Sequence, residues 1–108
     1  MAQTPEGKVK AEVRKILKRA EVYFFSPAAN GYGRVGIPDF ICCVDGLFLG
    51  VECKAGNNKP TALQVRELEA IEKQGGATLV VNEDNLFELE ALLEELKSDF
   101  LSMRVPVH

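Results

Sequence analysis

Two β-forming runs, residues 37–44 and 47–54, are joined by Asp45-Gly46 and constrain the fold of this chain more than any other stretch. A two-residue Asp-Gly loop between such runs is typical of a type I′ hairpin, because that turn needs positive φ at both central residues. The loop sets the register, so alternate residues share a face. One face carries only apolar and cysteine side chains, which predicts a core: Phe40, Cys42, Val44, Leu47, Leu49, Val51 and Cys53.

The other face of the hairpin carries charge. The register places Asp39 directly opposite Glu52, with Cβ atoms about 4.5–5.5 Å apart, and puts Lys54 on the same face. Like charges that face each other destabilise a sheet, so we expect replacement of Asp39 by asparagine to raise the metal-free stability. A hard divalent cation such as Mg²⁺ relieves the repulsion, because it binds carboxylate oxygens. Gly50 neighbours Glu52 and is expected to leave room beside it.

The residues on this charged face match a family pattern. Pro38-Asp39 followed by Glu52-Cys53-Lys54 resembles the PD-(D/E)xK nuclease superfamily. With the glycines 31, 33 and 36 and Tyr32 ahead of it, the pattern is similar to the VRR-NUC branch, the virus-type replication-repair nucleases, in its small stand-alone phage form. The alternative is an ordinary edge hairpin with a chance cluster of charges.

The resemblance covers about residues 5–95 and implies a fold. That fold is an α/β, restriction-endonuclease-like core in the order α-β-β-β-α-β-α, with a mixed central sheet flanked by helices. At 108 residues the chain is expected to form a single domain, residues 1–108, with residues 98–108 as a tail beyond the core. The tail is apolar enough to pack onto the domain or to form a dimer contact.

The resemblance also implies a metal site and its chemistry. It assigns Mg²⁺ or Mn²⁺ to the carboxylates of Asp39 and Glu52 and to the backbone carbonyl of Cys53. Lys54 would orient or activate the attacking water. A glutamate of the first helix often joins this site in the superfamily, directly or through water, and Glu12 is the residue we expect there. The alternative for Glu12 is a plain surface acid.

Gln64 has two interpretations. Thr61-x-x-Gln64 is a capping box, in which the Gln64 side chain accepts a hydrogen bond from the Thr61 backbone N–H at the start of a helix. In the resembled family a glutamine at this place supports the active site or the scissile strand. One side chain cannot easily serve both purposes, and we favour the functional one. Val65, Leu68 and Ile71 are expected to turn inward from the same helix.

Charge is distributed unevenly along the chain. The formal net charge is −3, yet residues 1–66 hold ten Lys and Arg against six acids, and residues 67–108 hold three against ten. Basic residues can neutralise DNA phosphates and release counterions. The residues that we expect to contact DNA lie on the first helix, in the glycine loop and after the hairpin: Lys8, Lys10, Arg14, Lys15, Lys18, Tyr32, Arg34 and Lys59. For the helix the alternative is a solvated face.

The last two elements complete the expected fold. Residues 77–81 form an apolar strand that we expect in the interior of the sheet. The final helix has an apolar leucine stripe and an acidic surface that would repel DNA, so we expect it to point away from DNA. The leucines of that stripe are Leu86, Leu89, Leu92, Leu93 and Leu96.

Composition excludes several classes of function. The only histidine is His108, which argues against histidine-based nuclease sites, Ser-His-Asp hydrolysis and the usual zinc sites. The three cysteines form no CxxC pair and are interpreted as buried free thiols of a reducing compartment. No apolar run is long enough for a membrane helix, so a cytoplasmic location in a phage-infected or bacterial host is expected.

These features together predict a Mg²⁺- or Mn²⁺-dependent deoxyribonuclease. The expected substrate is DNA, and the family resemblance favours branched DNA such as four-way (Holliday) junctions. A homodimer would present two sites to the two opposed strands of a junction. The alternative is a catalytically silent DNA-binding module that retains the nuclease fold.

Overall fold

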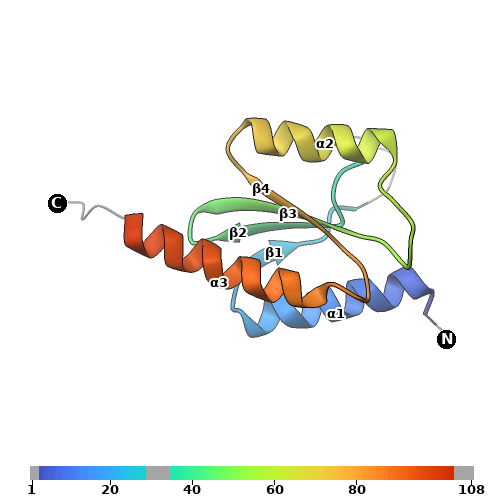
Figure 1. Ribbon diagram of the computed structural model, residues 1–108, viewed down its shortest axis with the longest axis horizontal. Coiled ribbons are helices and arrows are strands. Elements are labelled where there is room, and N and C mark those ends of the chain that lie inside the picture. The colour runs from blue at the N-terminus through green and yellow to red at the C-terminus, as the bar shows by residue number, and fades with distance from the viewer. Residues whose placement is uncertain (1–2, 29–34, 104–108) are drawn as a thin grey trace.

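The computed structural model describes residues 3–28 and 35–103. Within them the chain folds as α-β-β-β-α-β-α, the order expected for a restriction-endonuclease-like core (Figure 1). The elements are α1 (Pro5–Arg19), β1 (Tyr23–Phe25), β2 (Phe40–Val44), β3 (Leu47–Cys53), α2 (Ala62–Lys73), β4 (Ala77–Val81) and α3 (Leu86–Met103).

The four strands form one mixed sheet in the order β1-β2-β3-β4. Strands β1, β2 and β3 pair antiparallel, whereas β3 and β4 pair parallel. The predicted hairpin register is confirmed from Val44 opposite Leu47 to Phe40 opposite Val51. Both loop residues have positive φ, 50° at Asp45 and 91° at Gly46. The observed register is therefore the one that a two-residue turn with positive φ predicts.

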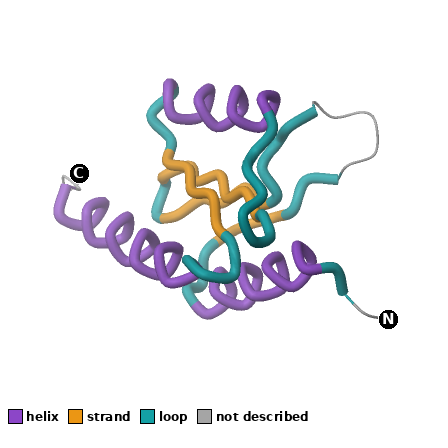
Figure 2. The backbone as a smooth tube through the Cα atoms, turned by 45° about the vertical axis from the view of Figure 1, so that its right-hand side comes forward, coloured by secondary structure: helices purple, strands orange, loops and turns teal. Residues whose placement is uncertain are grey.

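Helices cover both faces of the sheet. Helix α2 lies on one face, and α1 and α3 lie side by side on the other (Figures 1 and 2). The acidic helix α3 therefore shares a layer with the basic helix α1, and the expectation that α3 points away from DNA stays a prediction. The connection through α2 joins two parallel strands, and the chain leaving β4 then returns under the opposite face, next to α1.

The apolar face of the hairpin forms the core, as predicted, and it packs against α1 and α3. Phe40, Leu49, Val51 and Cys53 are fully buried there. The leucine stripe of α3 reaches the same core, with Leu89 and Leu93 buried and the other three leucines packed against them. Two expectations fail at the edges of this core. Cys43 is exposed because it points away from α1 and α3, and Val65 is 39% exposed, although Leu68 of the same helix is buried.

Local signals in the sequence set the helix starts. The Thr4 hydroxyl accepts from the Gly7 N–H at 3.0 Å, and Pro5 occupies the first turn of α1, where its missing N–H costs nothing. The capping box of α2 is present: the Gln64 Oε1 accepts from the Thr61 N–H at 2.8 Å and the Thr61 hydroxyl accepts from the Gln64 N–H at 3.2 Å.

The last strand and helix differ from expectation in two ways. Strand β4 lies at an edge of the sheet rather than in its interior, and α2 and α3 shield it from opposite faces. Helix α3 continues to Met103, so residues 98–103 extend a helix instead of forming a separate tail. Residues 104–108 lie outside the described part of the chain. No helix in the described ranges is long and apolar enough to cross a membrane.

Candidate active site

Asp39 lies just before β2 and is held by one side-chain donor and one backbone donor from the ends of the neighbouring strands. The Ser26 hydroxyl, at the end of β1, donates to the Asp39 carbonyl at 2.9 Å. The Cys53 backbone N–H, at the end of β3, donates to Asp39 Oδ2 at 2.8 Å. Asp39 thus lies one position beyond Phe40 and Val51, the last pair of the hairpin ladder. The Cys53 N–H fixes the orientation of the Asp39 side chain.

Glu52 is the one buried charged residue of the described chain, with a relative exposure of 2%. Its Oε2 lies 3.4 Å from the Lys54 Nζ, whose side chain is only 12% exposed. Its Oε1 is buried and has no hydrogen-bond partner among the described residues. Burial, and then the negative charge of Asp39, raise the pKa of Glu52 to about 7, although Lys54 opposes the shift. An unpaired buried carboxylate oxygen is costly unless a ligand satisfies it.

The Lys10 side chain of α1 reaches Asp39 and is itself paired with Glu6. Lys10 Nζ lies 3.4 Å from Asp39 Oδ1 and 3.6 Å from Glu6 Oε2. Burial lowers the pKa of Lys10, but the charge and hydrogen bond of Asp39 and the charge of Glu6 outweigh it and raise the pKa overall. Sequence reasoning missed Glu6, although its spacing of four residues from Lys10 was a signal for an ion pair on one helix face.

Other predicted site residues lie elsewhere. Glu12 pairs with Lys15 at 3.4 Å along the helix surface and has no recorded contact with Asp39 or Glu52. Glu6 is the acid of the first helix that is linked to Asp39, because both side chains contact Lys10. The Oε1 of Gln64 accepts the hydrogen bond of the capping box. A catalytic role for either Glu12 or Gln64 stays a prediction.

The space expected beside Gly50 is filled. A Cβ on Gly50 would lie 2.9 Å from Ile71 Cδ1 and 3.1 Å from Pro38 Cγ. Helix α2 therefore packs directly on this part of the hairpin, and the expectation of open room is wrong. The physical reason is tertiary: the missing side chain admits α2 rather than a substrate.

The predicted DNA-contacting residues divide between α1 and its surroundings. Arg14 lies over the Phe40 ring, 5.2 Å from the guanidinium carbon to the ring centroid, so its side chain helps dock α1 on the sheet. Lys8 and Glu12 line a cavity of about 230 Å³ with Glu83 and Leu86. For Lys18 and Lys59 the structure gives no contact that supports a role. Tyr32 and Arg34 lie outside the described residues.

Comparison with known proteins places this geometry in a family. No family model matches the chain. A protein of Acyrthosiphon pisum secondary endosymbiont phage 1, named "Putative nuclease p44", is 38% identical over 77 residues. The match covers 70% of this chain and 76% of the phage protein. The chain belongs to the family of this phage nuclease.

Membership of a nuclease family gives the site geometry a chemical context. Phosphodiester hydrolysis requires that charge building on the phosphate be compensated, commonly by a divalent cation held by carboxylates. Among the described residues no group of three or more His, Cys, Asp or Glu side chains is arranged to hold a metal. The side-chain donors are two carboxylates, Asp39 and Glu52. The backbone carbonyl of Cys53, which directly follows Glu52 in the chain, is the third donor that the family resemblance implies.

One structural observation indicates that these donors fit a hard cation. The unpartnered Oε1 of Glu52 needs a positive or donating group, and no described side chain supplies one. Oxygen is the ligand type that Mg²⁺ and Mn²⁺ prefer, and Mg²⁺ is usually bound through one or two carboxylates together with water and substrate phosphates. The two carboxylates of this site match the number of protein carboxylates that commonly hold Mg²⁺.

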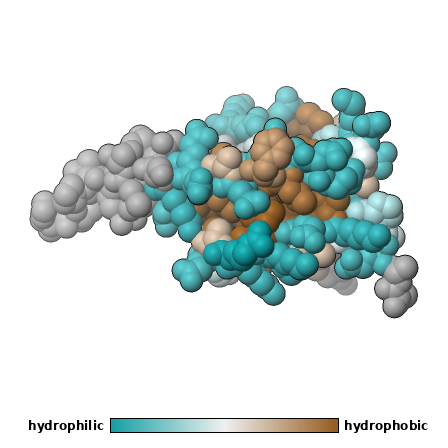
Figure 3. Space-filling view, turned by 60° about the horizontal axis from the view of Figure 1, so that its bottom comes forward, coloured by the Kyte–Doolittle hydropathy of each residue, from teal (hydrophilic) through white to brown (hydrophobic). Residues whose placement is uncertain are grey.

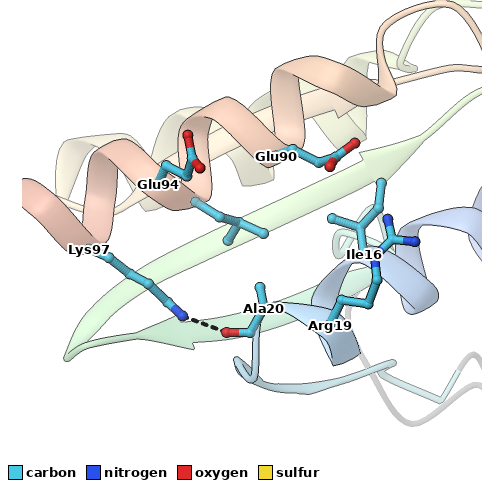
Figure 4. Close-up of a pocket in the computed structure, with 7 residues that line it drawn as sticks. Ile16, Arg19, Ala20, Glu90, Glu94 and Lys97 are labelled. Atoms are coloured by element: carbon cyan, nitrogen blue, oxygen red, sulfur yellow. Dashed lines mark hydrogen bonds between the residues drawn. The ribbon is translucent and has the colours of Figure 1, made fainter.

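A second cavity lies at the other end of α1 and belongs to a different part of the molecule. It has a volume of about 270 Å³ between α1 and α3 (Figure 4). Ile16 and Arg19 come from α1, Glu90 and Glu94 come from α3, and Lys97 donates to the Ala20 carbonyl. The face that comes forward when the bottom of Figure 1 is turned to the viewer shows hydrophobic residues between hydrophilic ones (Figure 3). None of the predicted catalytic residues lines this cavity.

Proposed function

We propose that this chain is a Mg²⁺- or Mn²⁺-dependent DNA endonuclease of the PD-(D/E)xK type, and that it belongs to the VRR-NUC branch. The observation that carries the proposal is the buried Glu52, whose Oε1 has no partner in the described chain and whose neighbours are Asp39 and Lys54. An acid in this position destabilises the free protein. Its presence is explained if a cation completes the site.

The side chains of the site would have two roles in hydrolysis: some would hold the cation, and one would act on the attacking water. Asp39 and Glu52 would hold the cation, together with the Cys53 carbonyl. The hydrogen bond from the Cys53 N–H fixes the rotation of Asp39, so one carboxylate oxygen remains directed towards the site. When bound, the cation would supply Lewis-acid stabilisation of the phosphate charge. Lys54 would orient the attacking water, because its amine lies beside Glu52. To take the proton of that water, Lys54 would first have to release its own proton to solvent and act as the neutral amine.

We further propose branched DNA as the substrate and a homodimer as the active form. The four-way junction is approximately two-fold symmetric, so a two-fold dimer could present one site to each of two opposed strands. The bare part of the sheet offers a surface for such a contact. Tyr23 is 72% exposed, and Phe25 and Phe48 are 49% and 46% exposed, on the face that α2 covers only in part.

The competing function is a DNA-binding module without catalysis. Lys54 distinguishes the two, because a binding module does not need it. We expect Lys54→Ala to lose cleavage by at least about a hundred-fold and to keep its DNA affinity, since phosphate attraction is spread over many bases. Lys54→Arg should also fail to cleave, because a guanidinium group does not act as a base near neutral pH.

Flap, four-way and linear DNA, each with Mg²⁺, Mn²⁺ or EDTA, provide the assay for cleavage, and gel shift on the same substrates measures binding. The nuclease proposal requires cleavage that EDTA abolishes. Native-rate cleavage by Lys54→Arg would rule out Lys54 as the base, and the absence of cleavage on every substrate and metal would favour the binding module.

A further inference from the structure

In the free protein, Lys10 lies beside the carboxylate oxygen of Asp39 that the proposed cation would bind. Its Nζ lies 3.4 Å from Asp39 Oδ1, and Glu6 supports it from one turn earlier on α1 at 3.6 Å. The other carboxylate oxygen, Oδ2, accepts the Cys53 N–H. Both oxygens of Asp39 are thus engaged, one by a rigid backbone donor and one by a flexible ammonium. Only the ammonium can leave without disturbing the sheet.

We propose that Lys10 is a positioning residue and an internal counter-ion: it competes with the divalent cation for Asp39 and moves to a DNA phosphate when that cation binds. The inference rests on the proposed function. It changes the role expected for Lys10 from one of several evenly contributing DNA contacts to a link between the metal and the DNA.

The physical basis is that one oxygen cannot easily serve two cations. A positive charge near Asp39 Oδ1 repels an incoming divalent ion, and the repulsion is strengthened by the partly buried setting, since the Asp39 side chain is 20% exposed. The lysine side chain is a point charge on a flexible stem, so it can turn to a nearby phosphate at little cost. A cation that stabilises the phosphate charge must contact that phosphate, which would place the phosphate within reach of Lys10.

A competition of this kind couples the two ligands. The cation must displace Lys10 when DNA is absent, whereas a bound phosphate offers Lys10 another partner and lowers that cost. Each ligand then raises the affinity of the other by the same factor, as linkage requires. Lys15 provides a matched comparison, because it lies on the same helix and pairs with a carboxylate at 3.4 Å. That carboxylate belongs to Glu12, which is neither Asp39 nor Glu52.

The first measurement is Mn²⁺ binding to the DNA-free protein. Electron paramagnetic resonance of the unbound ion monitors this binding at pH 8, where Glu52 is mostly ionised. We expect Lys10→Met to tighten the Mn²⁺ dissociation constant by about three- to ten-fold. Lys15→Met should leave it within about two-fold, because its partner does not touch Asp39. Lys10→Arg keeps the charge and should bind Mn²⁺ as the native chain does.

The second measurement is DNA affinity by gel shift, in EDTA and in Ca²⁺, a hard cation with the same preference for oxygen ligands. Lys10→Met should leave the affinity in EDTA within about two-fold and weaken it in Ca²⁺ by at least about five-fold. Lys15→Met should change both affinities by the same factor, whatever that factor is. Circular dichroism establishes that each variant is folded, and Lys10→Gln replaces Lys10→Met if the latter is not.

The outcomes separate this inference from the function on which it rests. If the native chain binds Mn²⁺, Asp39→Asn abolishes that binding, and Lys10→Met binds as the native chain does, the role of Lys10 is refuted and the metal site stands. If neither the native chain nor any Lys10 variant binds Mn²⁺ at its Asp39 site, the proposed function itself fails. Tighter Mn²⁺ binding with a Ca²⁺-dependent loss of DNA affinity supports the inference.

Discussion

Asp39 and Glu52 differ at the residue scale more than their matched positions in the hairpin indicate. Asp39 is compensated on both oxygens, by the Cys53 N–H and by Lys10. Glu52 is more deeply buried and has a partner, Lys54, at only one oxygen. The free-energy cost of placing two carboxylates together therefore falls mainly on Glu52, which is also the group whose pKa is raised.

The pH dependence of metal-free stability follows from this asymmetry. The pKa of Glu52 rises from 4.5 to about 7 on folding, so the stability associated with protonated Glu52 is fully present below about pH 4.5 and lost as pH rises through 7. We expect the native chain in EDTA to lose about 1–3 kcal/mol between pH 5 and pH 8 relative to Glu52→Gln, which cannot titrate. Urea unfolding of both chains across this range measures the difference.

Mg²⁺ should reverse that loss at pH 8 in the native chain and have little effect on Glu52→Gln, because it would satisfy the ionised carboxylate. Parallel stability-against-pH curves for the two chains in EDTA would contradict the burial-driven pKa shift of Glu52.

Asp39→Asn is now expected to behave differently from the expectation based on sequence. The substitution removes repulsion with Glu52 but also removes the ion pair with Lys10. Each contribution is on the order of 0.5–1 kcal/mol and their signs are opposite. We expect metal-free stability to change by less than about 0.5 kcal/mol, with metal binding and cleavage lost. Urea unfolding in EDTA decides it, and a clear gain in stability would favour the simpler picture of two uncompensated carboxylates.

At the element scale, α2 and the hairpin meet through glycines. Gly36 has φ of 91°, and a Cβ there would lie 2.7 Å from the Leu63 carbonyl oxygen of α2. Gly50 admits Ile71 and Pro38 in the same way. These contacts place Pro38 and Asp39 relative to the start of α2. The approach of α2, and not open space for substrate, is what the glycines on this side of the hairpin permit.

A matched pair of glycines tests this packing. Gly75 also has φ of 91°, but a Cβ there would meet no atom within 4 Å. Gly75→Ala should therefore report backbone strain alone, about 1 kcal/mol, whereas Gly36→Ala adds a clash with backbone that cannot move aside and should cost about 2–4 kcal/mol. Urea unfolding of both variants measures the two losses. Equal losses would mean that Gly36 is not packed against α2 as described.

At the scale of the whole molecule, the layers decide where charge and apolar surface lie. Because α1 and α3 share a layer, the basic and acidic helices are neighbours, and Arg19 lines a cavity with Glu90 and Glu94. If α1 contacts DNA as proposed, we expect the DNA to approach from the side of α1 that faces away from α3. The other layer contains only α2 within the described chain, which leaves part of the sheet face bare, with Tyr23 at 72% exposure.

The proposed homodimer gives a prediction at this scale. Light scattering should show twice the chain mass of 11.9 kDa. Tyr23→Ser should weaken the dimer if the bare sheet face is the interface, because that change removes exposed apolar area. Phe87→Ser, which replaces a residue 66% exposed on α3 in the other layer, serves as the control. On a cruciform plasmid the dimer should cut both strands in one binding event. A monomer that makes single nicks would overturn the dimer and leave the nuclease proposal intact.

The sequence by itself determined the features that depend on near neighbours in the chain. The Asp45-Gly46 turn set the register that brings Asp39 to Cys53 and Glu52, since a two-residue loop permits few alternatives. The capping residues Thr4 and Thr61 set two helix starts, because each satisfies backbone N–H groups within one turn.

Only the tertiary structure decided which distant groups meet. The phase of α1 against the sheet brings Lys10 and Glu6, rather than Glu12, towards Asp39, and a helical repeat in the sequence does not specify that phase relative to another element. The burial that leaves Glu52 Oε1 without a partner arises where β4 and the helices close around the end of β3. Desolvation depends on every layer at once, so the raised pKa of Glu52 is a property of the assembled fold.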